Sequence, residues 1–405
     1  MVGVDQVLEK LSTVIDPDLK KDIVSMGMIK DLELNDGNLK FTLELTTPAC
    51  PFNVEIEDDV RKAIAEIKEL KNFDMKVTAK VMEGRSLDAD SGMATVKNII
   101  GVASGKGGVG KSTVSLNLAL ALSQTGAKVG LLDADIYGPS IPLMLGMKSA
   151  YMEVENNKLQ PAKSHGLQVV SFGFFAEQSH QAAIYRGPII SGILKQFLVD
   201  TNWSDLDYLI VDLPPGTGDI PLTLAQTIPI TGILVVTTPQ DVASNVAVKA
   251  IGMFEKLNVP ILGVIENMSH FICTNDVEYT YPLPTSSPSF LQRLKCIFKP
   301  SSKEIRKTKT ELKKCGKKHY IFGDGGAQKI SDQFKIPFLG EIPLNSGIMS
   351  GSDLGKPIMI TDPDSPSANA FRTSAKNIAA QCSILAAKMQ EEMKSESTNE
   401  SIPTS

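Results

Sequence analysis

The hydrophobic pattern predicts two differently built regions, which meet near residue 96. In the first region, apolar residues recur at helical spacing or at every second position, which is typical of a small α+β unit over residues 1–82. Asn35-Asp36-Gly37-Asn38 is a turn signal that predicts a hairpin. Residues 83–95 are polar and have no period, so we expect a linker there. The predicted helices are Val4–Val14 and Val54–Leu70, and the predicted strands are Ile29–Leu34, Leu39–Leu45 and Met75–Met82.

From residue 96 to residue 390, short uninterrupted apolar runs alternate with helical stretches. This pattern predicts the α/β class, with a mostly parallel sheet covered by helices on both faces. Ligands in such sheets bind beyond the carboxyl ends of the strands, so we expect the functional residues to gather there. The predicted strands are Ile99–Ala103, Val129–Leu132, Leu167–Phe172, Tyr208–Val211, Gly232–Thr237, Ile261–Ile265 and Pro337–Ile342.

Two segments depart from this pattern. Residues 277–314 begin rich in Pro and Ser and end strongly basic, with nine Lys and Arg against three Glu. Their charge of +6, in a chain of net charge −5, leaves −11 for the rest. We expect a disordered insert there and a disordered polar tail over residues 391–405. The sequence leaves open whether the insert is a genuine loop or an unspliced intron in a gene model.

Composition narrows the class of protein. The chain has 405 residues, of which 42% are hydrophobic and 21% charged, as in soluble proteins with more than one domain. The net charge of −5 gives no global attraction to nucleic acid or anionic lipid, and no apolar run reaches the ~18 residues of a membrane span. Five cysteines favour a reducing compartment. The N-terminus shows no targeting pattern, so we expect a cytoplasmic protein, or an organellar one if the N-terminus is truncated.

One octapeptide carries the strongest chemical signal. Gly105-Lys106-Gly107-Gly108-Val109-Gly110-Lys111-Ser112 matches the phosphate-loop pattern G-x-x-x-x-G-K-[ST] between a predicted strand and a predicted helix. Backbone N–H groups of such a loop and the helix N-terminus can cradle phosphate oxygens. We expect Lys111 to reach the β- and γ-phosphates and the Ser112 hydroxyl to bind Mg²⁺. Lys106 is either a cation that acts on a nucleotide in a second subunit or a solvated loop residue.

Acidic residues end two of the predicted strands. Asp133 and Asp135 follow one strand, and Asp212 ends another. An Asp at such a position is typical of a Walker B residue, so we expect Asp212 to hold Mg²⁺ and Asp135 to orient the attacking water. Gly216 follows Asp212 in a Pro-Pro-Gly-Thr-Gly run, and we expect its N–H to sense the γ-phosphate.

Several motifs together resemble those of the Mrp/ApbC-type iron–sulfur cluster carrier ATPases, which have a deviant Walker A motif and a nitrogenase-iron-protein-like P-loop fold. The resemblance covers residues 97–276 and 320–380. Asp16–Asp18 and Thr46–Pro51 make the N-terminal unit similar to the small iron–sulfur-assembly domain often fused ahead of this ATPase. The ATPase motifs are Ser104–Thr113, Asp133–Ser140, Arg186–Gly192, Asp207–Asp219, Thr237–Asp241 and Glu266–Ser269.

The resemblance implies an ATP hydrolase that works as a homodimer around two ATP molecules with Mg²⁺. It also implies a task, which is to carry a [4Fe–4S] cluster to apoproteins, and it implies scaffold proteins as further partners. Lys106 then corresponds to the lysine that crosses to the partner's nucleotide. Asn267 and Pro239 correspond to contacts on the adenine side, and Thr113 completes the nucleotide-binding loop. We expect neither nucleic acid nor a membrane as partner.

The family places a C-x-x-C pair shortly after the motif at Glu266–Ser269. In this chain 41 residues separate Cys273 from Cys315, and without residues 277–314 the two would lie close to the family spacing. Two thiolates per subunit would supply four across a dimer, which suits cluster ligation. We therefore predict Cys273 and Cys315 as cluster ligands, and two unrelated thiols remain the alternative.

The other cysteines and one histidine carry weaker signals. Cys50 is either a transient ligand or a capped turn residue, and Cys296 is either a substitute ligand or a solvated thiol. Cys382 is predicted to lie in the core of a C-terminal helix. His319 is predicted to be a surface residue.

Two other functions remain as alternatives. A ParA/MinD-like positioning ATPase shares the phosphate loop, but it needs a membrane-targeting helix or a basic DNA surface. The amphipathic stretch Ala368–Glu392 ends acidic, which suits neither. An ATP-gated electron donor would also need the bridged cluster, so only a transfer assay separates it from a carrier.

Overall fold

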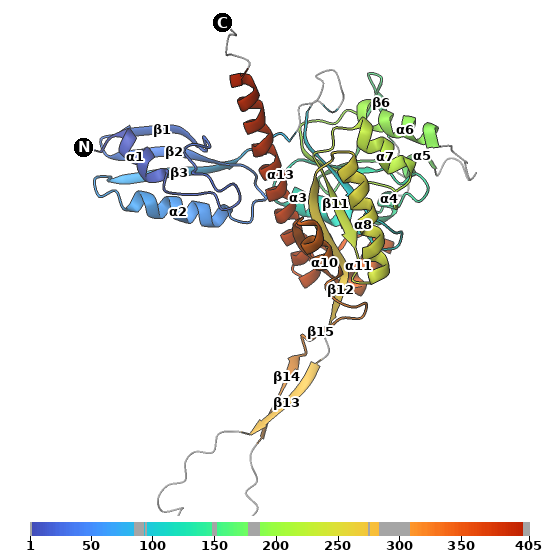
Figure 1. Cartoon of the computed structure of the whole chain (residues 1–405). Coiled ribbons are helices and arrows are strands. Elements are labelled where there is room, and N and C mark those ends of the chain that lie inside the picture. Colours follow the sequence, from blue (N-terminus) through green and yellow to red (C-terminus); the bar gives the residue numbers. More distant parts are fainter. Residues whose placement is uncertain are drawn as a thin grey trace, which may run out of the picture.

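The computed structural model describes residues 2–84, 93, 95–147, 152–176, 187–273, 276–282 and 308–399. Within them, a small N-terminal domain and a larger domain lie on opposite sides of the long helix α13 (Pro366–Asn399) (Figure 1). Most of the predicted linker, residues 85–92 and 94, lies outside the described residues.

The small domain is a three-stranded sheet with two helices. Strands β1 (Ile29–Asn35), β2 (Asn38–Leu45) and β3 (Asn72–Ala79) lie in that order, β1 antiparallel and β3 parallel to β2. Alternate side chains of β2 are buried in a core shared with α1 (Val4–Leu11) and α2 (Asn53–Ala65). The predicted α+β unit and its hairpin are therefore confirmed, although both helices end earlier than predicted.

The larger domain is built on nine strands, counted over the described part of the chain. Their spatial order is β15-β12-β11-β4-β10-β5-β9-β8, with β16 also paired to β12. All pairs are parallel except β15 with β12 and β8 with β9, which confirms the α/β class. The strands are β4 (Val96–Ala103), β5 (Val129–Asp133), β8 (Ala162–Ser164), β9 (Leu167–Ser171), β10 (Leu206–Asp212), β11 (Gly232–Thr237), β12 (Ile261–Ile272), β15 (Lys318–His319) and β16 (Phe338–Leu344).

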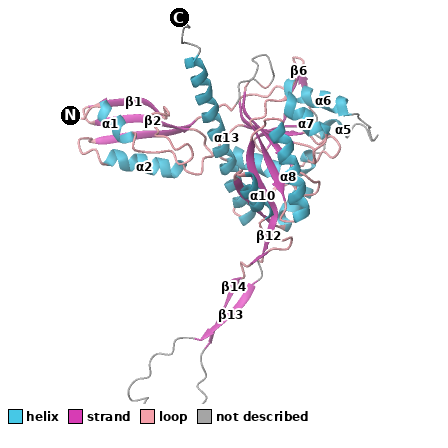
Figure 2. Ribbon diagram, in the orientation of Figure 1, coloured by secondary structure: helices cyan, strands magenta, loops and turns pink. Residues whose placement is uncertain are grey.

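Helices cover both faces of this sheet (Figure 2). One layer holds α3 (Lys111–Gln124) and α12 (Ile358–Thr361), which pack with α13. The other layer holds α6 (Gly187–Val199), α7 (Asp219–Thr227), α8 (Asp241–Lys256) and α10 (Gly326–Phe334). Shorter elements complete the domain: α4 (Ile141–Met144), β6 (Val154–Glu155), β7 (Lys158–Leu159), α5 (Gly173–Ala176) and α11 (Ser346–Asp353). Because both faces are covered, the central strands read as uninterrupted apolar runs.

The two domains meet through buried contacts rather than through a tether alone. The hydroxyls of Thr47 and Tyr208 are hydrogen bonded at 2.9 Å, and both residues are fully buried. Ala49 and Val81 belong to the hydrophobic core of the larger domain. In the C-terminal part of α13, Glu391 pairs with Lys21 of the small domain. The small domain is thus docked on the strand β10 that ends at Asp212.

The predicted disorder of residues 277–314 is wrong at both ends of that segment. Strands β13 (Asp276–Pro282) and β14 (Thr308–Lys314) form an antiparallel ribbon that projects beyond β15 (Figure 1). The physical reason is alternation: Val277, Tyr279 and Tyr281 are strand formers at every second position, which the polar composition concealed. Residues 283–307 lie outside the described residues.

The predicted disorder of the tail is also wrong in part. α13 continues through residue 391 to Asn399, and only residues 400–405 lie outside the described residues. Extending a helix that packing already anchors costs little, because each added residue gains a hydrogen bond without a new nucleus. Polarity after residue 391 therefore does not end the helix.

Candidate functional site

The phosphate loop is shaped by close backbone approaches. A Cβ on Gly105 would lie 2.4 Å from the Val246 carbonyl carbon of α8, so only glycine fits there. Gly108 and Gly110 have φ of +83° and +81°, a backbone conformation that glycine adopts freely. The loop leads directly from β4 into α3, as the sequence predicts. The conformation of the phosphate loop is therefore constrained by contacts with residues outside the loop, such as Val246 of α8.

Lys111 and Asp212 form a buried ion pair beneath the loop. The Lys111 ammonium donates to Asp212 Oδ1 at 2.6 Å, and the two side chains are 6% and 0% exposed. The Ser115 hydroxyl donates to the same oxygen at 2.7 Å. Asp212 Oδ2 is buried and has no hydrogen-bond partner within the described residues. A carboxylate oxygen without a partner therefore lies next to the Lys111 ammonium.

Asp133 and Asp135 differ in their surroundings. Asp133 is fully buried and accepts from the backbone N–H of Ile141 and the Ser171 hydroxyl. Burial, reinforced by the neighbouring charge of Asp212, raises the pKa of the Asp133 carboxyl. Asp135 is half-buried and lines the cavity in front of the loop. Asp133 is thus a structural group, and Asp135 is the carboxylate that faces the cavity.

Two predicted residues lie differently from expectation. The Gly216 N–H donates to the Ser104 carbonyl at 2.8 Å, so here it is bound to the phosphate loop itself. Pro239 is buried, and its carbonyl oxygen would lie 2.7 Å from a Cβ at Gly326, the start of α10. Pro239 does not line the cavity, because α10 covers it.

Asn267 contacts the loop from β12. Its Nδ2 donates to the Val109 carbonyl at 2.8 Å, and a Cβ on Gly110 would lie 2.2 Å from that nitrogen. This bond fixes the orientation of the amide, so the Oδ1 atom is the end left to accept a hydrogen bond. Asn267 thus lies against the phosphate loop, and its predicted contact with adenine stays a prediction.

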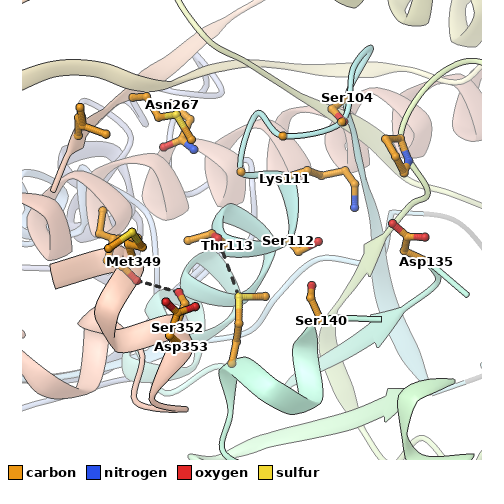
Figure 3. A pocket seen from close by; sticks show the side chains of 18 of the residues that line it. Ser104, Lys111, Ser112, Thr113, Asp135, Ser140, Asn267, Met349, Ser352 and Asp353 are labelled. Atoms are coloured by element: carbon orange, nitrogen blue, oxygen red, sulfur yellow. Dashed lines mark hydrogen bonds between the residues drawn. The ribbon is translucent and has the colours of Figure 1, made fainter. Parts of the chain in front are cut away.

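A cavity of about 460 Å³ lies in front of the loop. Figure 3 shows Lys111, Ser112 and Asp135 on one side of Thr113, and Met349, Ser352 and Asp353 on the other. The volume is within the range of ligand pockets. The latter three residues belong to α11, which the sequence reading missed although Asn345 caps this helix. An Asn that directly follows an apolar strand is the signal that could have found it.

Cys273 and Cys315 are brought together by strand pairing. β15 runs antiparallel to the end of β12, with Phe271 opposite His319. Beyond that pair, the Cys273 N–H donates to the Lys317 carbonyl at 3.0 Å, and the Gly316 N–H donates to the Cys273 carbonyl at 2.9 Å. Both thiols are free and half-buried. The ribbon β13–β14 closes on itself beyond them, so the insert does not separate the cysteines.

The remaining cysteines lie elsewhere. Cys50 is 5% exposed, and its thiol donates to Asp18 Oδ2 at 3.3 Å. Burial raises the pKa of the Cys50 thiol to about 12 and that of Cys382 to about 12 as well. Cys382 lies in the core, as predicted, and His319 is exposed. Cys296 lies outside the described residues. Across the described ranges, no cluster of three or more His, Cys, Asp or Glu could hold a metal ion.

Sequence comparison identifies two families along the chain. Residues 95–291 and 308–379 match the family described as NUBPL iron-transfer P-loop NTPase. Residues 4–77 match the family described as iron-sulfur cluster assembly protein. The gap in the first match is residues 292–307, so the segment foreign to the family is shorter than the predicted insert of 277–314.

Individual relatives agree with the family match. A protein of Synechocystis named iron-sulfur cluster carrier protein is 42% identical over 390 residues, which cover 95% of this chain and 99% of that protein. The chloroplastic Fe-S cluster assembly factor HCF101 of Arabidopsis thaliana is 38% identical over 383 residues, which cover 93% of this chain and 63% of that protein. A solved nucleotide-binding protein from Archaeoglobus fulgidus, in complex with ADP, shares 34% identity at a TM-score of 0.53 and covers 71% of this chain and 98% of that one.

The fold, the loop and the comparisons point to the same class of protein. In the part of the chain that the structure describes, no helix is long and apolar enough to cross a membrane. The phosphate loop, the buried Lys111–Asp212 pair and the adjacent cysteines all lie within the matched residues. This chain belongs to the family of NUBPL iron-transfer P-loop NTPases, with an iron-sulfur cluster assembly domain at its N-terminus.

Proposed function

We propose that this protein hydrolyses ATP as a homodimer and carries a [4Fe–4S] cluster between its subunits for delivery to apoproteins. One observation carries the proposal. Strand β12 bears Asn267, which contacts the phosphate loop, and ends at Ile272. The next residue is Cys273, whose backbone is hydrogen bonded to Gly316 and Lys317, beside Cys315. A nucleotide-dependent shift of this strand would reach the cysteines directly. The names of the relatives support a carrier role.

The chain's own groups fit ATP and Mg²⁺. The loop N–H groups and Lys111 bind phosphates, and Asn267 Oδ1 can accept from the exocyclic amino group of adenine. The Ser112 hydroxyl and the unpartnered Asp212 Oδ2 are the oxygen ligands that Mg²⁺ prefers. When bound, Mg²⁺ neutralises charge that develops on the phosphates. Asp135 would orient the attacking water, and the exposed Lys106 would act on the partner's nucleotide.

The cysteine end of β12 fits a surface between two subunits. Phe271, Tyr320, Ile321 and Phe322 are large apolar side chains, each at least 36% exposed, beside Cys273 and Cys315. A second copy that covers this apolar surface would bring two more thiols to the same place. Four thiolates complete the ligand set of a [4Fe–4S] cluster. The apoproteins that receive the cluster, and the scaffold proteins, would then bind this protein in a reducing compartment such as the cytoplasm.

The test is anaerobic reconstitution of the full chain, followed by iron and sulfide analysis and transfer to an apoprotein that requires a [4Fe–4S] cluster. We expect about four iron and four sulfide per dimer. The variant Cys273→Ser, Cys315→Ser should lose them and keep its ATPase activity and its unfolding midpoint, because oxygen is a poor ligand for this cluster. Cys50→Ser is the matched control and should bind cluster normally. Full cluster binding by the double-serine variant would exclude these cysteines as the bridge.

A further inference from the structure

The cavity in front of the phosphate loop has a second wall, α11, to which no role has been assigned. Ile348, Met349, Ser352 and Asp353 of this helix line the same cavity as Thr113 of α3. In Figure 3, Met349, Ser352 and Asp353 lie beyond Thr113, away from Lys111 and Asp135. A nucleotide whose phosphates occupy the loop therefore extends its sugar and base toward α11.

Asp353 is the one carboxylate on this wall, counted over the residues that line the cavity and are described. It is exposed and has neither a hydrogen bond nor an ion pair within the described residues. The neighbouring Ser352 hydroxyl donates its one proton to the Ile348 carbonyl at 2.8 Å, so it can offer a ligand only a neutral acceptor. Asp353 is thus the charged acceptor that this wall offers to a ligand.

The position of Asp353 is unfavourable for the helix itself. Asp353 is the last residue of α11, where the helix dipole is negative and an acidic side chain is destabilising. Nevertheless the end of the helix is held rigidly. Gly355 has φ of +70°, and a Cβ there would lie 2.4 Å from the Gly146 Cα that follows α4. The Lys356 N–H donates to the Gly351 carbonyl at 2.7 Å. A carboxylate that is carried on a fixed helix end and does not help its own helix suggests a role toward a ligand.

We propose that Asp353 binds the ribose hydroxyls of the nucleotide and so selects ribonucleotides. A carboxylate accepts hydrogen bonds from both hydroxyls of a vicinal diol, and such charge-assisted bonds are about twice as strong as neutral ones. The inference rests on the proposed binding of ATP at the phosphate loop. It adds a sugar-reading residue on a separate element.

The experiment compares ADP with 2′,3′-dideoxy-ADP by isothermal titration calorimetry on the full chain with Mg²⁺. Wild-type protein should bind ADP roughly 10-fold more tightly than the dideoxy analogue. Asp353→Ala should lower the ADP affinity to the level of the analogue and leave the analogue's affinity unchanged. Asp353→Asn, which keeps a neutral acceptor, should fall between. Asp364→Ala, an exposed carboxylate outside the cavity, is the matched control and should match wild type.

The outcomes separate this inference from the proposed function. Equal affinity of wild-type protein for the two nucleotides overturns the role of Asp353 and leaves ATP binding intact. If Asp353→Ala loses affinity for both nucleotides equally, the role of Asp353 is overturned as well, whether or not the unfolding midpoint changes. A contact with the sugar hydroxyls cannot affect the dideoxy analogue, which lacks them. Failure of wild-type protein to bind either nucleotide overturns the proposed ATP site itself.

Discussion

The two ends of the functional region are held in different ways. At the nucleotide end, neighbouring groups leave no room for a Cβ at Gly105 and Gly110, and Lys111 is paired with a buried carboxylate. At the cysteine end, backbone hydrogen bonds between two strands hold Cys273 beside Cys315. Packing fixes positions closely and tolerates little change. Strand pairing fixes register only, and for this reason the chain can carry an extra segment between the two cysteines.

The largest effect is expected from Lys111→Ala. ATP hydrolysis should fall at least ~10³-fold, because the loop loses the charge that stabilises the transferred phosphoryl group. The free energy of unfolding should also fall by ~3–5 kcal/mol, because Asp212 is left buried without its cation. Activity assays and urea denaturation measure the two effects. Lys128→Ala breaks only the exposed pair with Asp205 and should cost under ~1 kcal/mol. Unchanged hydrolysis in Lys111→Ala would exclude the phosphate loop.

Lys106→Ala should affect hydrolysis alone. Lys106 is exposed at the cavity, and no ion pair is found for it within the described residues, so its ammonium is available to a nucleotide bound by a second subunit. We expect hydrolysis to fall by roughly 10²–10³, as for other cations supplied in trans, and the Kd for ATP to change less than about threefold. Steady-state kinetics and calorimetry test this. A parallel loss of binding and turnover would make Lys106 a ligand of its own subunit's nucleotide.

Gly316→Pro tests the cysteine end. Gly316 has φ of +63° and donates its N–H to the Cys273 carbonyl, and proline can provide neither. Iron bound per dimer should fall several-fold, whereas ATPase activity should stay near wild type. Gly316→Asn is the matched control, because Asn keeps the N–H and tolerates positive φ. Equal iron contents in the two variants would show that this backbone bond does not position the thiols.

The last prediction concerns pH. Because the pKa of Asp133 is raised on folding, the folded protein holds its proton more firmly than the unfolded chain. Stability should therefore fall as pH rises above the unfolded pKa of about 4, by at most ~1.4 kcal/mol per pH unit, and level off above the folded pKa. Asp133→Asn should flatten this slope in urea denaturation followed from pH 4 to pH 8. An unchanged slope would place the pH dependence on other groups.

The sequence predicts the nucleotide end of this region better than the cysteine end. The phosphate loop, Asp135 and Asp212 are local to strand ends, and the apolar runs place those ends at one edge of the sheet. The bond between Gly216 and Ser104 could not be foreseen, because it depends on how one loop folds over another. Burial of Pro239 depends in the same way on where α10 packs. Such contacts are tertiary and leave no local pattern.

The sequence predicted Cys273 and Cys315 as a pair despite the residues between them, but it did not predict what brings them together. The antiparallel pairing of β13 and β14 closes the intervening loop at its base. Closing a longer loop costs little, since the entropy grows only with the logarithm of its length. Alternating Val277 and Tyr279 carried the strand signal, and the basic composition obscured it.

The buried hydrogen bond between Thr47 and Tyr208 limits which fragments of this protein can be studied separately. A fragment that begins after the linker keeps Tyr208 but loses Thr47, Ala49 and Val81, which cover the same surface. The Tyr208 hydroxyl of this fragment would lack its hydrogen-bond partner, and apolar surface would become exposed to solvent. Exposed apolar surface promotes self-association. The oligomeric state or solubility that is measured for an isolated ATPase fragment would therefore reflect a surface that is covered in the intact chain. Only the intact chain reports the assembly that the dimer proposal concerns.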